Sequence, residues 1–106
     1  MPMKNPAHPG RLVKSALEEL DLSIAQAADA LGVSRNQLHR VTTCKSAISA
    51  EMAVRLEAVI GSTADAWIKM QAAYDLAQVR NSADNPAKDL KRFIPSVPKP
   101  EQPSLV

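Results

Sequence analysis

Residues 23–41 read Ser-Ile-Ala-Gln-Ala-Ala-Asp-Ala-Leu-Gly-Val-Ser-Arg-Asn-Gln-Leu-His-Arg-Val. Ser23 is followed three residues later by Gln26, a spacing typical of the capping box that opens a helix. Gly32 can adopt the left-handed conformation in which many helices end. Ser34 begins the same capping pattern again with a second glutamine. The stretch therefore predicts two short helices joined by barely one turn of chain.

Apolar residues within this stretch recur at the spacing that buries one side of each helix. Ala28 is small where the two helices would cross, and Leu38 and Val41 provide the inward side of the second helix. Burial of these positions leaves the opposite side of the second helix free. The pattern predicts a helix-turn-helix, in which the second helix enters the major groove of DNA.

The free side of the second helix is rich in side chains that recognise base edges. Arg suits the O6 and N7 acceptors of guanine, and Asn or Gln suits N6 and N7 of adenine. Helix N-termini add outward-pointing backbone N–H groups that bind phosphate. We expect a double-stranded DNA operator as partner, and the predicted DNA-binding residues are Ser23, Gln26, Ser34, Arg35, Asn36, Gln37, His39, Arg40 and Lys45.

The distribution of charge favours the same surface, although the net charge does not. The chain of 106 residues has 13 Lys and Arg against 11 Asp and Glu, and this formal charge of +2 is too small to indicate a nucleic-acid partner. Between Asp29 and Glu51, however, the sequence contains basic residues and no acidic residue. A solvated basic face is the alternative, because most short charge clusters are solvated.

The segment before the motif predicts one more helix. Residues 1–8 contain two prolines and no periodicity, which indicates a flexible N-terminal arm. Pro9 suits the first turn of a helix, because its missing N–H would be unpaired there. The apolar stripe of this helix consists of Leu12, Val13, Ala16, Leu17 and Leu20.

Two further helices are predicted after the motif. Ser49 is a good N-cap for the fourth helix, and Ser62 opens a fifth helix that continues to Arg80. Residues 81–106 contain five prolines, which exclude regular helix and predict an extended, Pro-rich tail. The expected fold class is all-α, with one five-helix domain over residues 9–80.

The fifth helix has two apolar faces. One face consists of Ala66, Trp67, Met70, Ala73, Tyr74 and Ala77, and the other of Ile68, Ala72, Leu76 and Val79. A small domain covers only one such face, so the second needs a partner. The sequence predicts a homodimer, for which the chosen interface residues are Trp67, Met70, Tyr74 and Ala77, although the pattern does not decide between the two faces. A tail folded back over the second face is the alternative.

Four segments within residues 8–80 carry a family resemblance. They are His8-Pro-Gly, Leu31-Gly-Val-Ser-Arg-Asn, Ala50-Glu-Met-Ala-Val-Arg-Leu leading into Gly61-Ser, and Trp67-Ile-x-x-Gln71-x-x-Tyr74-Asp-Leu. They resemble the lambda-repressor-like (Xre) regulators and, among these, the antitoxins of HigA type. The resemblance implies a dimer that represses its own operon at a palindromic operator. The Trp67 segment, which general Xre repressors lack, implies a partner toxin of the RelE-like (HigB-type) ribonuclease class.

The chain departs from the family pattern in two places. Ile24 stands where relatives usually have Gln, so a familiar side-chain contact to phosphate is missing. Thr43 and Cys44 stand where relatives usually have Asn-Gly, which calls a glycine-based left-handed cap into question.

Other classes of function find little support in the residues. His8, His39 and Cys44 have no ligand spacing, so we expect no metal, and no nucleophile stands beside a base, so we expect neither an enzyme nor a cofactor. No apolar stretch is long enough for a signal peptide or a membrane span, and a lone cysteine forms no internal disulfide. We expect a cytoplasmic protein.

Three functions stay open from the sequence. They are an autoregulating antitoxin, a stand-alone Xre-type repressor without a toxin, and, less strongly, an interaction module that has lost DNA binding. A small basic ribonuclease gene beside this one would favour the antitoxin.

Overall fold

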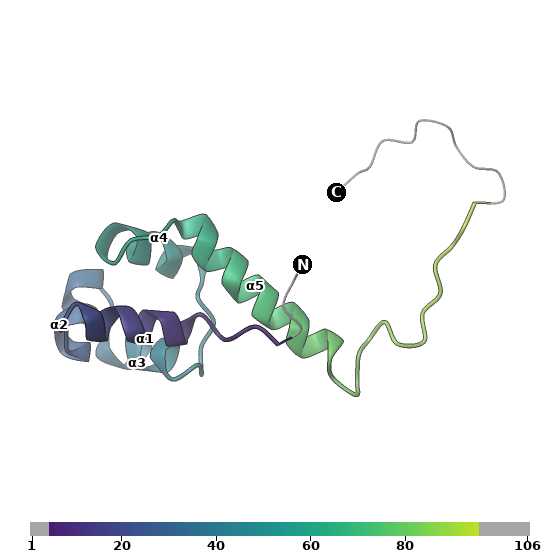
Figure 1. The fold of residues 1–106 in the computed structure, drawn as a ribbon, viewed down its shortest axis with the longest axis horizontal. Helices are drawn as coiled ribbons and strands as arrows, with labels where there is room; N and C mark the ends of the chain where they lie inside the picture. Colours follow the sequence, from purple (N-terminus) through teal and green to yellow (C-terminus); the bar gives the residue numbers. More distant parts are fainter. Residues whose placement is uncertain (1–4, 96–106) are drawn as a thin grey trace.

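Five helices form the fold of residues 5–95, the part of the chain that this computed structural model describes (Figure 1). They are α1 (Gly10–Glu19), α2 (Ile24–Leu31), α3 (Arg35–Thr42), α4 (Ala50–Val59) and α5 (Ala64–Arg80). α2 packs on α3, α1 packs on α3, and α4 contacts both α2 and α5. Residues 5–95 contain no strand, so the predicted all-α fold is confirmed.

The predicted arm and tail extend beyond the described residues, because residues 1–4 and 96–106 lie outside them. Residues 81–95 form turns and irregular backbone without a helix. Within residues 5–95 no helix is both long and apolar enough to span a membrane.

Side-chain hydroxyl groups cap the helices that follow α1. Ser23 Oγ accepts a hydrogen bond from the Gln26 N–H at 3.1 Å, and Gln26 Oε1 accepts one from the Ser23 N–H at 2.9 Å, which completes the predicted capping box. At α3, Ser34 makes the first of these two bonds but not the second. At α5 the prediction was wrong by one residue. Thr63 is the cap, because Ser62 takes up a left-handed turn conformation with a φ of 59°.

A core of small and branched side chains holds the helices together. It consists of Val13, Leu17, Ala27, Ala28, Leu31, Leu38, Val41, Ile48, Met52, Ala53, Leu56 and Trp67. The stripe predicted for α1 was too wide, since Leu12 and Leu20 are 50% and 51% exposed. The reason is that α3 is the main neighbour of α1 and covers only the strip that contains Val13 and Leu17.

Polar contacts fix α5 on the rest of the domain. Trp67 is buried, and its Nε1–H donates to the carbonyl of Gly61 at 3.1 Å. Gln71 is buried too; its Oε1 accepts from the Ile48 N–H at 2.8 Å, and its Nε2 donates to Asp75 Oδ1 at 3.0 Å. The Trp67 side chain, predicted at a dimer interface, thus lies in the core of the domain.

His8 closes the N-terminal side of the domain. Its Nδ1 accepts a hydrogen bond from the Gly10 N–H at 2.9 Å, and its ring meets Tyr74 edge-on with centroids 4.9 Å apart. Burial lowers the pKa of His8, against opposing contributions from the Asp75 carboxylate and the Ser46 backbone. The ring is thereby kept neutral, the form that can accept from Gly10. The packed domain includes His8, one residue earlier than its predicted start.

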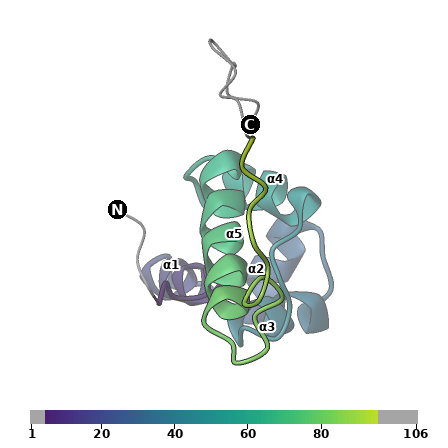
Figure 2. The same cartoon turned by 90° about the vertical axis from the view of Figure 1, so that its right-hand side faces the viewer.

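The second apolar face of α5 is open. Ile68, Leu76 and Val79 are 37%, 49% and 48% exposed. In the view of Figure 2, α1 lies on one side of α5 and α4 on the other, and neither covers this face. Of the two faces predicted for α5, the one with Trp67 packs on the core, and the one with Leu76 is exposed.

Candidate nucleic-acid interface

The turn between α2 and α3 sets the angle at which α3 is presented. Gly32 has a φ of 73°, and its N–H donates to the carbonyls of Ala28 and Asp29 at the end of α2. Arg55 of α4 reaches over the turn, and its Nη1 donates to the Leu31 carbonyl at 2.8 Å. The turn is thus held from α2 and from α4. Arg55 was not found from the sequence, because its partner lies 24 residues away.

The outer side of α3 is exposed, as the pattern predicts. Leu38, Val41 and Thr42 point into the domain and are buried. The exposed residues include all of those chosen as DNA-binding: Ser23, Gln26, Ser34, Arg35, Asn36, Gln37, His39, Arg40 and Lys45. The structure therefore brings these residues to the surfaces of α3, the first turn of α2 and the loop after α3.

Several of these side chains already have structural partners. Ser23, Gln26 and Ser34 use their side chains as caps. At the start of α2, the backbone N–H groups of Ile24 and Ala25 have no partner within residues 5–95, and such groups are suited to a phosphate. The first turn of α2 therefore offers backbone N–H groups to a ligand, and Ile24, in the place where relatives usually have Gln, leaves this backbone unchanged.

Arg40 is also engaged within the protein. Its Nε donates to Ser46 Oγ at 2.9 Å and its Nη2 to the Lys45 carbonyl at 3.3 Å. Arg40 therefore braces the loop that leads to α4, and it would have to exchange these bonds to contact a base. In the described part of the chain, no side-chain hydrogen bond is made by Arg35, Asn36, Gln37 or His39, and of these Arg35 and Asn36 lie in the first turn of α3.

The loop after α3 keeps a left-handed residue without a glycine. Cys44 has a φ of 63°, and its N–H donates to the Val41 carbonyl at 3.0 Å. A side chain in this conformation costs on the order of 1 kcal/mol. The left-handed residue that a glycine would provide at low cost is thus present here in Cys44, at a steric cost.

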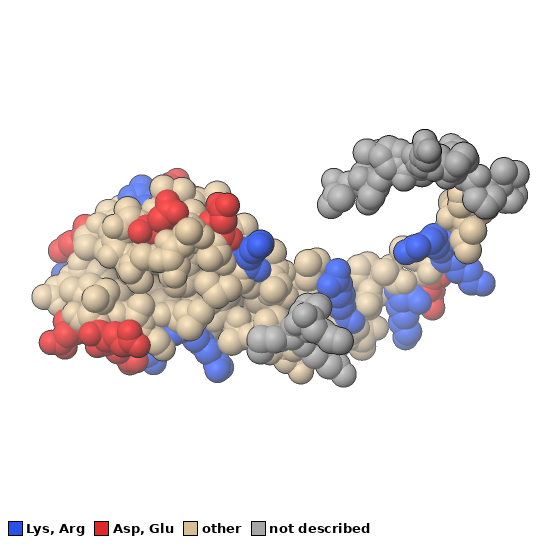
Figure 3. Space-filling view, turned by 45° about the horizontal axis from the view of Figure 1, so that its top comes forward, with Lys and Arg blue, Asp and Glu red and all other residues tan. Residues whose placement is uncertain are grey.

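Charged side chains are unevenly distributed over the molecule. On the face shown in Figure 3, acidic side chains gather at the left-hand end, which α1 to α4 form. Basic side chains lie along the segment after α5. α3 itself has no acidic residue, and its last turn contains His39 and Arg40. The surface of α3 is therefore the one that a polyanion can approach without repulsion from its own helix.

The comparisons with known proteins agree with this geometry. The sequence profile of the helix-turn-helix family matches residues 13–67, from α1 to the start of α5. The chain belongs to the Xre-type helix-turn-helix family. This Xre-type protein is 47% identical over 78 residues to virulence-associated protein A' of Dichelobacter nodosus, which covers 73% of this chain and 68% of that protein.

HigA antitoxins are among the relatives. Antitoxin HigA-1 of Vibrio cholerae is 30% identical, over 89% of this chain and 90% of its own. The solved structure of the Pseudomonas aeruginosa antitoxin HigA with the higBA promoter matches with a TM-score of 0.76 at 30% identity, and it covers 83% of this chain and 97% of that one. The predicted resemblance of this Xre-type protein to HigA-type antitoxins is confirmed.

The two arginines of α3 should behave differently when replaced. Arg35→Ala should weaken binding to a DNA fragment from the protein's own promoter by roughly 1–3 kcal/mol, about 5- to 150-fold. Thermal stability should not fall, because the change removes only the expected base contact. Arg40→Ala should lower the melting temperature as well, since it also removes two hydrogen bonds to the loop. Fluorescence titration with promoter DNA and thermal melts measure both effects.

Lys88→Ala is the control, because Lys88 is an exposed residue of the irregular segment after α5, away from both α3 and the open face of α5. Unchanged promoter affinity in Arg35→Ala would remove Arg35 from the reading surface. Unchanged stability in Arg40→Ala would show that its hydrogen bonds do not brace the loop.

Proposed function

We propose that this protein is the antitoxin of a toxin-antitoxin module. As a dimer it represses its own operon by binding a palindromic operator, and it neutralises a RelE-like (HigB-type) ribonuclease toxin. The observation that carries the proposal is the α3 surface, where Arg35 and Asn36 are exposed beside the first turn of α2 and their side chains have no hydrogen-bond partner among residues 5–95. A site of action on DNA also fits the cytoplasmic location expected from the sequence.

The DNA-binding part rests on how the motif is held. The Gly32 turn and Arg55 keep α3 standing out from the domain with its polar side outward. Helices presented in this way lie in the major groove, with residues near their N-termini at the base edges. Arg35 and Asn36 occupy the first turn of α3, where such contacts are made.

The dimer part rests on the open face of α5. Three large apolar side chains, Ile68, Leu76 and Val79, lie along one side of this helix and are partly exposed. A second copy that packs against the same face would bury them about a twofold axis. Such a dimer would place two α3 helices in successive major grooves, about 34 Å apart.

Replacement of Leu76 tests the dimer. Leu76→Glu should sediment as a monomer at micromolar concentration, because a charge in the interface is not compensated. Its operator affinity should also fall steeply, since the two half-sites are no longer bound jointly. Gln78→Glu, on another side of α5, is the control. A wild-type protein that sediments as a monomer, or a Leu76→Glu protein that stays dimeric, would contradict this interface.

The toxin part rests on the relation to HigA antitoxins, which extends over α5 and most of the chain. One observation favours a second candidate, a stand-alone Xre-type repressor. The Trp67 segment, from which a toxin partner was inferred, has Trp67 and Gln71 buried within the domain, so those two side chains are not available to a toxin. Toxin contacts would have to lie on other surfaces.

Operator binding and toxin binding should be separable. A protein with Arg35→Ala and Asn36→Ala should lose its operator but still bind the ribonuclease encoded beside its gene and rescue growth from it, because only the α3 surface changes. Gel-shift, pull-down and growth assays on the same protein measure this. Absence of any such ribonuclease would favour the stand-alone repressor. Toxin binding lost with operator binding kept would invert the assignment of the surfaces.

A further inference from the structure

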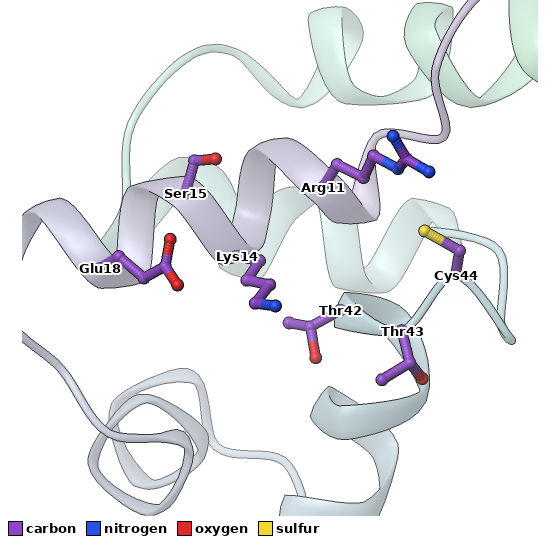
Figure 4. Close-up of a pocket in the computed structure, with 7 residues that line it drawn as sticks. All are labelled: Arg11, Lys14, Ser15, Glu18, Thr42, Thr43 and Cys44. Atoms are coloured by element: carbon purple, nitrogen blue, oxygen red, sulfur yellow. The ribbon is translucent and has the colours of Figure 1, made fainter.

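A trough runs between α1 and the end of α3 (Figure 4). It encloses about 500 Å³ and is lined by Arg11, Lys14, Ser15 and Glu18 of α1 on one side and by Thr42, Thr43 and Cys44 on the other. An adjoining hollow of about 240 Å³ shares Lys14, Glu18, Thr42 and Thr43 with it and continues to Ile24 and His39. The trough therefore connects the DNA-facing side of α2 and α3 with the basic residues of α1.

The positive charges of this trough are not used within the fold. Arg11 and Lys14 are exposed, and the ion pair found among residues 5–95 joins two other residues, Glu51 and Arg55. Lys14 extends from α1 toward Thr42 (Figure 4). The hydroxyl groups of Thr42 and Thr43 donate to a backbone carbonyl of α3, at 3.0 Å and 2.7 Å. The cationic groups of α1 are thus the donors that remain for a ligand.

The chemistry of these donors points to an oxyanion. Ammonium and guanidinium groups bind phosphate through charge-assisted hydrogen bonds. Ser15, between Lys14 and Glu18 on α1, adds a hydroxyl to the same wall. The wall has one opposing charge, Glu18, which lines the hollow on the side toward Ile24.

We propose that this trough binds the phosphate backbone of the operator through Arg11 and Lys14, in continuation of the phosphate site at the start of α2. The proposal rests on the proposed DNA-binding function and extends its footprint onto α1. A DNA strand that passes the first turn of α2 and His39 meets the open end of the trough. Phosphate contacts at this place add affinity and fix the docking of α3 without reading sequence.

The test is the salt dependence of DNA binding. In a protein with Arg11→Ala and Lys14→Ala, the slope of log K against log salt should become shallower by about 0.9 for each lost phosphate contact, so the ratio of wild-type to variant affinity grows roughly 8-fold per contact for each tenfold reduction in salt. Operator and unrelated DNA should be affected alike. Glu18→Gln should act in the opposite direction and tighten binding at low salt.

Lys88→Ala removes a positive charge from the exposed segment after α5 and serves as the control, and thermal melts establish that each variant is folded. If the wild type binds DNA tightly but the salt slope is unchanged in the Arg11→Ala, Lys14→Ala protein and in Glu18→Gln, the trough does not bind phosphate. The assignment of α3 to DNA reading would be left intact. Failure of the wild type to bind any DNA would overturn both. Loss of toxin binding with unchanged DNA binding would assign the trough to a protein partner and overturn the proposal.

Discussion

The left-handed turn at Gly32 is the constraint on which the DNA-facing surface depends. A Cβ at this position would lie 2.8 Å from Arg55 Nη1, the group that also donates to the Leu31 carbonyl. The turn is therefore shaped by the absence of a side chain and clamped by α4. Once it is fixed, α3 lies against α1 on one side and is open on the other. The exposed position of Arg35 and the trough beside Lys14 both follow from this placement of α3.

Features that depend on neighbouring residues could be predicted from the sequence. The Ser23 and Ser34 caps and the left-handed conformation of Gly32 depend on residues a few positions apart, the exposed side of α3 follows from the spacing of its apolar residues, and the structure has all of them. Local patterns failed where two neighbours offer the same chemistry. Ser62 and Thr63 both have a cap-forming hydroxyl, and spacing alone does not reveal which of them adopts the extended conformation of a cap.

Contacts between distant segments could not be predicted in the same way. The Gln71 side chain binds the Ile48 N–H across 23 residues, and no periodicity reports such a bond. His8 was assigned to the N-terminal arm because the residues next to it in the sequence give no sign of burial. Its ring packs against Tyr74 of α5, which is distant in the sequence. The position of Lys14 in a trough beside α3 depends in the same way on the packing of α1 on α3.

The central claim is that the exposed side of α3 reads DNA in the major groove. Dimethyl sulfate footprinting of the promoter with the full-length protein tests it most directly, because the reagent methylates guanine N7 in the major groove and adenine N3 in the minor groove. The account predicts protection of guanine N7 within the bound site, lost when Arg35 and Asn36 are replaced by alanine. Protection confined to adenine N3, or a guanine footprint that survives both replacements, would contradict it.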